Sequence, residues 1–113
     1  MIDLKIEIKE SFRKNITKYK AAFAKMLQEI IEKAGYLVER ESKMVTPIDT
    51  GRLRASIMTE IGAYSAIIAP HTDYAFFVHE GTRFMSARPF MKQGYDKALP
   101  AIRKEMGSIF KVT

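Results

Sequence analysis

Residues 2–38 read IDLKIEIKESFRKNITKYKAAFAKMLQEIIEKAGYLV, and the spacing of the hydrophobic residues changes within this stretch. Residues 2–9 alternate between hydrophobic and charged side chains, which is typical of a strand with one buried face. After Ser11, a common helix N-cap, hydrophobic residues recur at steps of three and four. This predicts one amphipathic helix over residues 11–44, about 50 Å long. Its hydrophobic stripe comprises Phe12, Ile16, Tyr19, Phe23, Met26, Ile30, Ala34 and Leu37.

Glycine and proline divide the rest of the chain into short elements. Gly35 weakens the long helix by about 1 kcal/mol relative to alanine, so we expect a kink there or the end of its first section. Residues 46–51, TPIDTG, stop the helix because proline disfavours helical geometry at the preceding residue. One short helical turn is expected over residues 52–56.

The second half of the sequence predicts a hairpin, a helix and a final strand. The expected ranges are two strands at 57–61 and 66–69 joined by a turn at 62–65, a helix at 89–105 and a short strand within 108–112. Pro100 lies inside the predicted helix and should kink it or break it in two. The predicted fold class is α+β, with a long N-terminal helix on a small antiparallel sheet and a second, C-terminal helix. Residues 1–113 should form a single domain.

The composition excludes several classes of protein. The chain has 113 residues and no cysteine, which rules out a disulfide scaffold, a thiol nucleophile and a cysteine–zinc site. No hydrophobic run approaches the roughly 18 to 20 residues of a membrane span, and no secretory signal is visible at the N-terminus. We therefore expect that the protein does not associate with a membrane and that it assembles in a cytoplasm.

The formal net charge of +6 has two interpretations. Residues 11–25 include five basic residues and no acidic one, and Lys14, Lys18 and Lys25 fall together on the polar side of the predicted helix. Such a stripe attracts a polyanion such as DNA without sequence specificity. An ordinary solvated helix face has the same pattern and is the more common case. A small basic nucleic-acid-binding protein is therefore the alternative function, although no known nucleic-acid-binding motif is present.

No catalytic or cofactor motif is complete. The pair His79-Glu80 lacks the second histidine of the helical zinc motif, because Arg83 occupies that position. Residues 49–51, Asp-Thr-Gly, match an aspartic-protease triplet, but that site needs two facing aspartates. Gly51 and Gly81 belong to no glycine-rich phosphate loop. We therefore expect no enzyme activity, no cofactor, no metal and no small-molecule substrate.

Two short stretches resemble a known family. The first is TPIDTGRLRASI at residues 46–57, directly after the long predicted helix; the second is YAFFVHEGT at residues 74–82, followed by ARPFM at residues 87–91. In this order and spacing they resemble the tail-completion, or head–tail joining, proteins of long-tailed bacteriophages and prophages. The similarity covers residues 12–105. An acidic and an aromatic residue often precede the Gly-Thr pair in that family, so His79 departs from the pattern.

The resemblance implies a structural protein at the head-proximal end, or neck, of a phage tail. It implies an oligomeric ring whose partners are other copies of the chain and the neighbouring connector and tail-tube proteins. The location would be the virion, and the bacterial cytoplasm during assembly. Candidate residues for loop geometry or contacts between subunits are Asp49, Thr50, Gly51, Arg52, Glu80, Gly81, Thr82, Phe84, Met85, Arg88, Pro89 and Phe90.

Two questions about these candidates stay open at the level of sequence. Arg52 and Arg88 can pair with acids of a neighbouring subunit, or within the chain with Glu80 or Asp49. Phe84 and Met85 lie in a polar loop, where they either complete the core of their own chain or dock on a partner.

Overall fold

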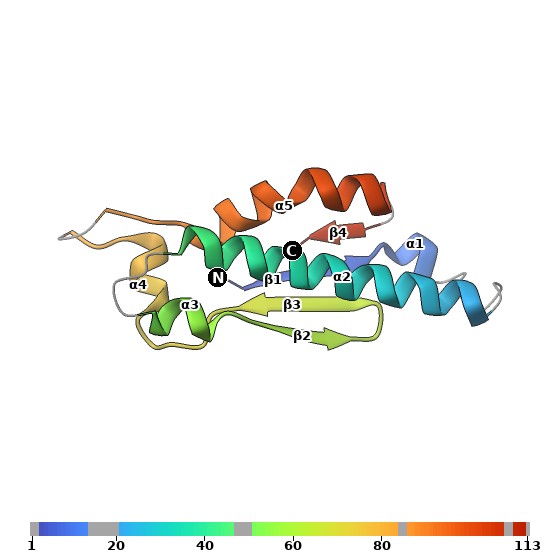
Figure 1. Cartoon of the computed structure of the whole chain (residues 1–113), viewed down its shortest axis with the longest axis horizontal. Helices are drawn as coiled ribbons and strands as arrows, with labels where there is room; N and C mark the ends of the chain where they lie inside the picture. Colours follow the sequence, from blue (N-terminus) through green and yellow to red (C-terminus); the bar gives the residue numbers. More distant parts are fainter. Residues whose placement is uncertain (1–2, 14–20, 47–50, 84–85, 108–109, 113) are drawn as a thin grey trace.

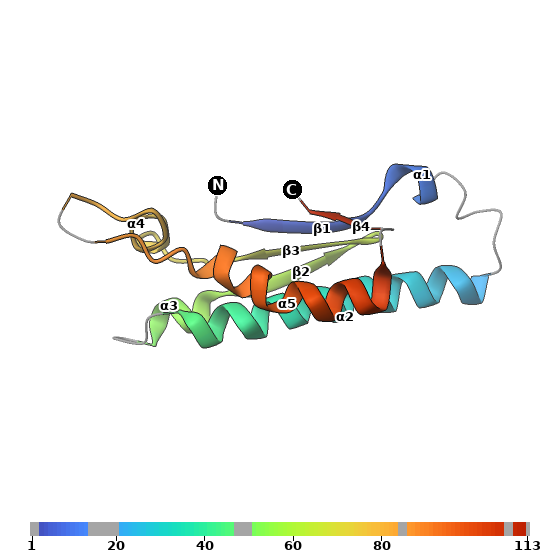
Figure 2. The same ribbon diagram turned by 90° about the horizontal axis from the view of Figure 1, so that it is seen from above.

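The fold has two layers, a helical layer and an antiparallel sheet (Figures 1 and 2). The computed structural model describes residues 3–13, 21–46, 51–83, 86–107 and 110–112. The elements are β1 (Leu4–Ile8), α1 (Glu10–Arg13), α2 (Ala21–Val45), α3 (Arg52–Ser56), β2 (Met58–Gly62), β3 (Ser65–Ala69), α4 (Ala75–Glu80), α5 (Phe90–Met106) and β4 (Phe110–Val112). The long helices α2 and α5 lie on the same side of the sheet (Figure 2). The predicted α+β class is therefore confirmed, as are the short helix after residue 51, the hairpin and the final strand.

Alternation along β1 separates the two faces of the sheet. The strand order is β2-β3-β1-β4, and all three pairings are antiparallel. Ile6 lies opposite Ala66 of β3 and Val112 of β4, and both Ile6 and Ala66 are fully buried. Glu7 lies opposite Lys111 on the other face. The alternating sequence of β1 thus directs its isoleucines toward the helices and its charges away from them.

The predicted single helix over residues 11–44 is wrong at its N-terminal end. α1 ends at Arg13 and α2 begins at Ala21, and Figure 2 shows α1 on the side of the sheet and α2 in the helical layer. The chain must reverse between β1 and α2 because α2 packs back across the sheet that contains β1. Hydrophobic spacing reports which face is buried, but it does not report such a reversal. The spacing is correct for α2, whose buried side includes Leu27, Ile31 and Val38.

Gly35 does not end the helix, so that part of the expectation is wrong, because α2 continues to Val45. A Cβ atom at Gly35 would lie 2.8 Å from Cβ of Ala66 and 3.0 Å from Cγ2 of Thr59. The glycine therefore permits close contact between α2 and the hairpin. A residue with a side chain would push the two layers apart.

Gly94 has the same role between α2 and α5. A Cβ atom there would lie 2.5 Å from Cα and 2.6 Å from the backbone nitrogen of Ser42. Ser42 is fully buried. The two long helices therefore pack backbone against backbone at this point.

Pro100 does not break α5 into two pieces, so that part of the expectation is wrong. α5 extends from Phe90 to Met106 with Pro100 inside it. Pro100 is exposed, which places the backbone group that loses its helical partner near the surface rather than in the core. The buried side of α5, which includes Met91, Ala98 and Ile102, is continuous across the proline.

Gln28 of α2 holds the turn of the β2–β3 hairpin. Its side-chain Nε2 donates to the carbonyl oxygen of Gly62 at 3.0 Å, and its Oε1 accepts from the backbone N–H of Tyr64 at 2.7 Å. Tyr64 has a positive φ of 54°, which is uncommon outside glycine. The sequence alone does not point to Gln28, because its role depends on a turn 34 residues away in the chain.

Candidate assembly interface

The motifs of the two distinctive stretches come together at one end of the molecule. α3, α4 and the chain that follows α4 meet there, at the left of Figure 1. We call residues 51–56, 71–83 and 86–89 the loop end. It lies at one extreme of an elongated body that measures 54 × 22 × 20 Å.

The first and last residues of α3 attach it to the other segments of the loop end. Gly51 precedes α3 with a φ of 70°, a left-handed conformation that glycine adopts without strain. The Arg52 guanidinium lies over the ring of Tyr74, 5.6 Å from its centroid. At the other end of α3, Ser56 Oγ accepts from the backbone N–H of His71 at 3.2 Å. Two distant parts of the sequence are thus joined by a cation–π contact and a hydrogen bond.

α4 exposes its two largest side chains. Ala75 is buried and Val78 packs against the core, whereas Phe76 and Phe77 have 53% and 54% of their surface exposed. Their rings are in contact in a T-shaped arrangement with centroids 5.9 Å apart. Adjacent exposed phenylalanines form the kind of hydrophobic patch that marks a protein–protein contact. This pair is not among the residues predicted from the sequence, although a helix beginning at residue 75 would place Ala75 and Val78 on one face and the phenylalanines outside it.

The end of α4 is fixed by backbone hydrogen bonds. Gly81, with a φ of 81°, donates its N–H to the carbonyl oxygen of Phe77 at 2.8 Å. The backbone N–H of Arg88 donates to the carbonyl oxygen of Val78 at 2.9 Å, which brings the returning chain alongside α4. The two predicted loop residues Gly81 and Arg88 are therefore both bonded to the last turn of α4.

His79, which departs from the family pattern, contacts one core residue and one surface residue. Its ring lies edge-on to the ring of Phe90, with centroids 5.3 Å apart, and its Nδ1 is 2.8 Å from Oε1 of Glu80. Phe90 is fully buried. His79 thus connects the surface residue Glu80 with the core residue Phe90.

Some of the candidate residues lie in the loop end, one lies in the core, one lies on α2, and the others lie outside the residues that the structure describes. Gly51, Arg52, Glu80, Gly81, Thr82, Arg88 and Pro89 lie in the loop end, and Phe90 lies in the core. Lys25 is exposed on α2. Asp49, Thr50, Phe84, Met85, Lys14 and Lys18 lie outside the described residues.

The arginines of the loop end do not pair with Glu80 in the described structure. Glu80 pairs with His79, and the Arg52 guanidinium stacks on Tyr74. Arg88 is exposed, and its side chain makes no ion pair with any residue that the structure describes. Arg54 is half-buried and donates from Nη2 to the carbonyl oxygen of Thr46 at 3.4 Å. Arg88 is therefore the best placed of these cations to meet an acidic group on another molecule.

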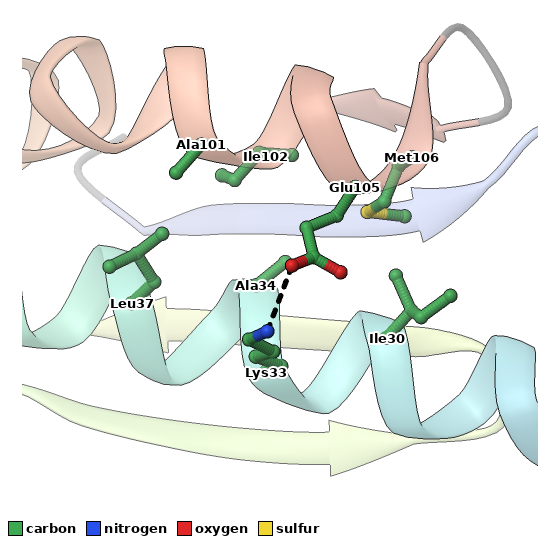
Figure 3. Close-up of a pocket in the computed structure, with 8 residues that line it drawn as sticks. All are labelled: Ile30, Lys33, Ala34, Leu37, Ala101, Ile102, Glu105 and Met106. Carbon is green, nitrogen blue, oxygen red and sulfur yellow. Dashed lines mark hydrogen bonds and ion pairs between the residues drawn. The ribbon is translucent and has the colours of Figure 1, made fainter.

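A groove between α2 and α5 is too small for a ligand. It has a volume of about 50 Å³, whereas ligand sites typically have roughly 300 to 1,000 Å³. Figure 3 shows the ion pair across it, in which Lys33 Nζ lies 2.9 Å from Glu105 Oε1. The hydrogen bond from Lys33 lowers the pKa of Glu105. The groove has a hydrophobic lining, which includes Ile30 and Leu37, so it is part of the packing between the two helices.

Within the ranges that the structure describes, no three His, Cys, Asp or Glu side chains are grouped so that they could hold a metal ion. None of the described helices is long and hydrophobic enough to cross a membrane.

Comparison with known proteins adds one match. Residues 10–81, more than half of the chain, match the family model described as "HK97-gp10_like: Bacteriophage HK97-gp10, putative tail-component". The match extends from α1 to the end of α4 and includes both exposed phenylalanines. No curated protein and no solved structure matches the chain.

Proposed function

The chain belongs to the HK97-gp10-like family of bacteriophage tail components, and from this premise we propose that it joins the phage tail to the DNA-filled head. Its role as a tail component is structural, and its place is the virion. In the proposal it occupies the head-proximal end of the tail as a subunit of an oligomeric ring. Residues 1–113 act as one domain, which assembles in the bacterial cytoplasm.

The exposed phenylalanine pair of α4 is the observation that carries this proposal. Phe76 and Phe77 are both more than half exposed, and Arg88, which is also exposed, lies on the chain segment that hydrogen-bonds to α4 at Val78. Aromatic residues and arginine supply most of the binding energy in many protein interfaces. The loop end is therefore the proposed contact with the neighbouring connector or tail-tube protein, and a contact of this kind requires no catalytic group.

The test is electron microscopy of a lysate from the parent phage or prophage in which this gene stops early. We expect filled heads beside unattached tails, and rescue of joining when the purified protein is added. The double variant Phe76→Ser/Phe77→Ser should fail to rescue. Met26→Ser is the matched control, because Met26 is 45% exposed and lies in the first turns of α2, whose N-terminal end is far from the loop end (Figure 1). Intact, infectious particles without the protein would contradict the joining role.

A second proposal is non-specific contact with DNA, which the exposed face of α5 favours. Lys92, Lys97, Arg103 and Lys104 are all exposed there. Titration with duplex DNA at two salt concentrations tests this proposal, because phosphate contacts weaken steeply as salt rises. Strong, salt-dependent binding by the free protein would support the alternative of a small nucleic-acid-binding protein. Binding that does not change with salt would contradict a phosphate contact.

A further inference from the structure

The sheet ends in a different strand at each edge. β2 forms one edge and β4 forms the other, with β3 and β1 between them. Within the described residues no further strand pairs with the outer side of β2 or of β4. An open edge presents backbone N–H and C=O groups that can pair with a strand of another chain.

The two edges differ in how the helical layer covers them. Figure 1 shows α5 beyond β4, outside the edge of the sheet, whereas no long helix lies beyond β2. A groove of about 320 Å³ lies between α5 and β4. Its lining includes Tyr95, Leu99 and Arg103 from α5, and Phe110 and Lys111 from β4. The helical layer thus projects past the sheet at one edge, and the sheet projects past the helical layer at the other.

We propose that β2 of a second copy of this chain enters this groove and pairs with β4, so that the sheet continues from one subunit to the next. The inference rests on the ring proposed above and identifies the contact that builds it. Strand direction alternates across the whole sheet, because each of the three pairings is antiparallel. A second copy placed beside the first in the same orientation therefore brings its β2 antiparallel to β4.

The side chains of the two edges match on both faces of the extended sheet. On the face toward the helices, Phe110 of β4 would meet Ile61 of the second copy's β2, and Ile61 is half-buried in the single chain. On the outer face, Lys111 would meet Glu60 of the second copy, and both residues are exposed in the single chain. Hydrophobic groups thus meet under α5, and opposite charges meet on the outer face.

The two layers also have equal widths. Four strands span about 19 Å at the usual spacing of about 4.8 Å. Two packed helices span about 18 Å at an interaxial distance of about 9 Å. Repetition of the subunit therefore leaves no gap in either layer, which a ring of identical subunits requires.

Disulfide trapping tests the contact, because the natural chain has no cysteine. The double variant Glu60→Cys/Lys111→Cys replaces the natural protein in the parent phage. The phage tails are then purified and oxidised. Within one chain these positions lie on opposite edge strands, about 14 Å apart. A disulfide requires Cα atoms closer than about 7 Å, so any bridge between them joins two copies. Met58→Cys replaces Glu60→Cys in a parallel sample, to allow for a shift of register by two residues.

We expect a covalent dimer in the tails, at least about ten times more abundant than in a control that combines Arg40→Cys with Lys111→Cys. Arg40 is exposed on α2, away from both edges of the sheet. Tails that contain the protein but give no dimer with either position of β2 would overturn the edge contact and leave the joining role intact. If tails built with the natural chain lack the protein, the proposed function fails and the edge contact fails with it.

A charge reversal provides a second test. Glu60→Lys places a cation opposite Lys111, so we expect it to lower incorporation into tails about tenfold. Glu29→Lys makes the same change at an exposed position of α2 and should have little effect. Equal incorporation of the two variants would contradict the pairing of Glu60 with Lys111.

Discussion

The frame of the molecule and its loop end place small and large residues in opposite ways. In the frame, which consists of the sheet with α2 and α5, Gly35 and Gly94 allow close contact between neighbouring elements. In the loop end, Phe76 and Phe77 point largely into solvent. Small residues inside allow backbones to approach, whereas large residues outside offer surface to a partner. Substitutions of buried residues in the frame should therefore change stability, and those of exposed residues in the loop end should change assembly.

The strongest test of this difference is a side chain at Gly94. Gly94→Leu would force the backbones of α2 and α5 apart, because even a Cβ atom would lie 2.5 Å from Cα of Ser42. We expect the free energy of unfolding to fall by about 3 kcal/mol. Urea denaturation of the purified protein measures the effect. Gln93→Leu is the matched control, because Gln93 is exposed one residue earlier on α5. Equal stability of the two variants would show that the helices do not cross at Gly94.

Removal of the Gln28 side chain should have a smaller effect on the frame. Gln28→Ala leaves the N–H of Tyr64 and the carbonyl of Gly62 without their side-chain partner. We expect a loss of about 1 to 2 kcal/mol in the free energy of unfolding. Glu29→Ala, at the next and exposed position of α2, is the control in the same denaturation experiment. If the hairpin needs no anchor, both variants will unfold at the same urea concentration.

The sequence predicted the frame better than it predicted the candidate site. Hydrophobic spacing identifies α2, α5 and β1 because each buries one face and the burial repeats with the period of the element. The same spacing did not reveal why Gly35 and Gly94 are glycines, since their reason lies on a different element in each case. The sequence marked the loop end through its motifs, but it did not separate the exposed Phe76 from the buried Phe90. The exposure of Phe76 depends on which face α4 turns toward the core, and the burial of Phe90 depends on how the start of α5 packs.

A substitution in the loop end should separate stability from assembly. Arg88→Ala removes an exposed guanidinium and keeps the backbone hydrogen bond from Arg88 to Val78. We expect the free energy of unfolding to change by less than about 0.5 kcal/mol, while joining of tails to heads falls. Thermal melting and counting of joined particles are compared with Arg40→Ala, which removes an exposed arginine of α2 in the frame. A loss of stability in proportion to the loss of joining would assign Arg88 to the frame instead.

A charge cluster on the outer face of the sheet should make a small, pH-dependent contribution to stability. Oε2 of Glu7 lies 3.4 Å from Nζ of Lys5, and Oε1 of Glu7 lies 3.2 Å from Nζ of Lys111. Burial raises the pKa of Glu7, but the hydrogen bonds and charges of Lys111 and Lys5 outweigh burial and leave the pKa lowered. A carboxyl whose pKa is lower in the folded state stabilises the fold above its pKa in the unfolded chain, and that stabilisation disappears as the pH falls through the folded pKa.

Glu7→Gln should therefore reduce stability near neutral pH and make little difference in acid, below the folded pKa of Glu7. The difference at neutral pH should stay within about 1 kcal/mol, because the lysines are partly exposed. Urea midpoints of the natural chain and the variant, measured from pH 7 to pH 3, check the prediction, with Glu10→Gln as the exposed control. The two curves should converge as the pH falls. A constant separation would mean that Glu7 contributes through packing, in the manner of the glycines of the frame, and not through its charge.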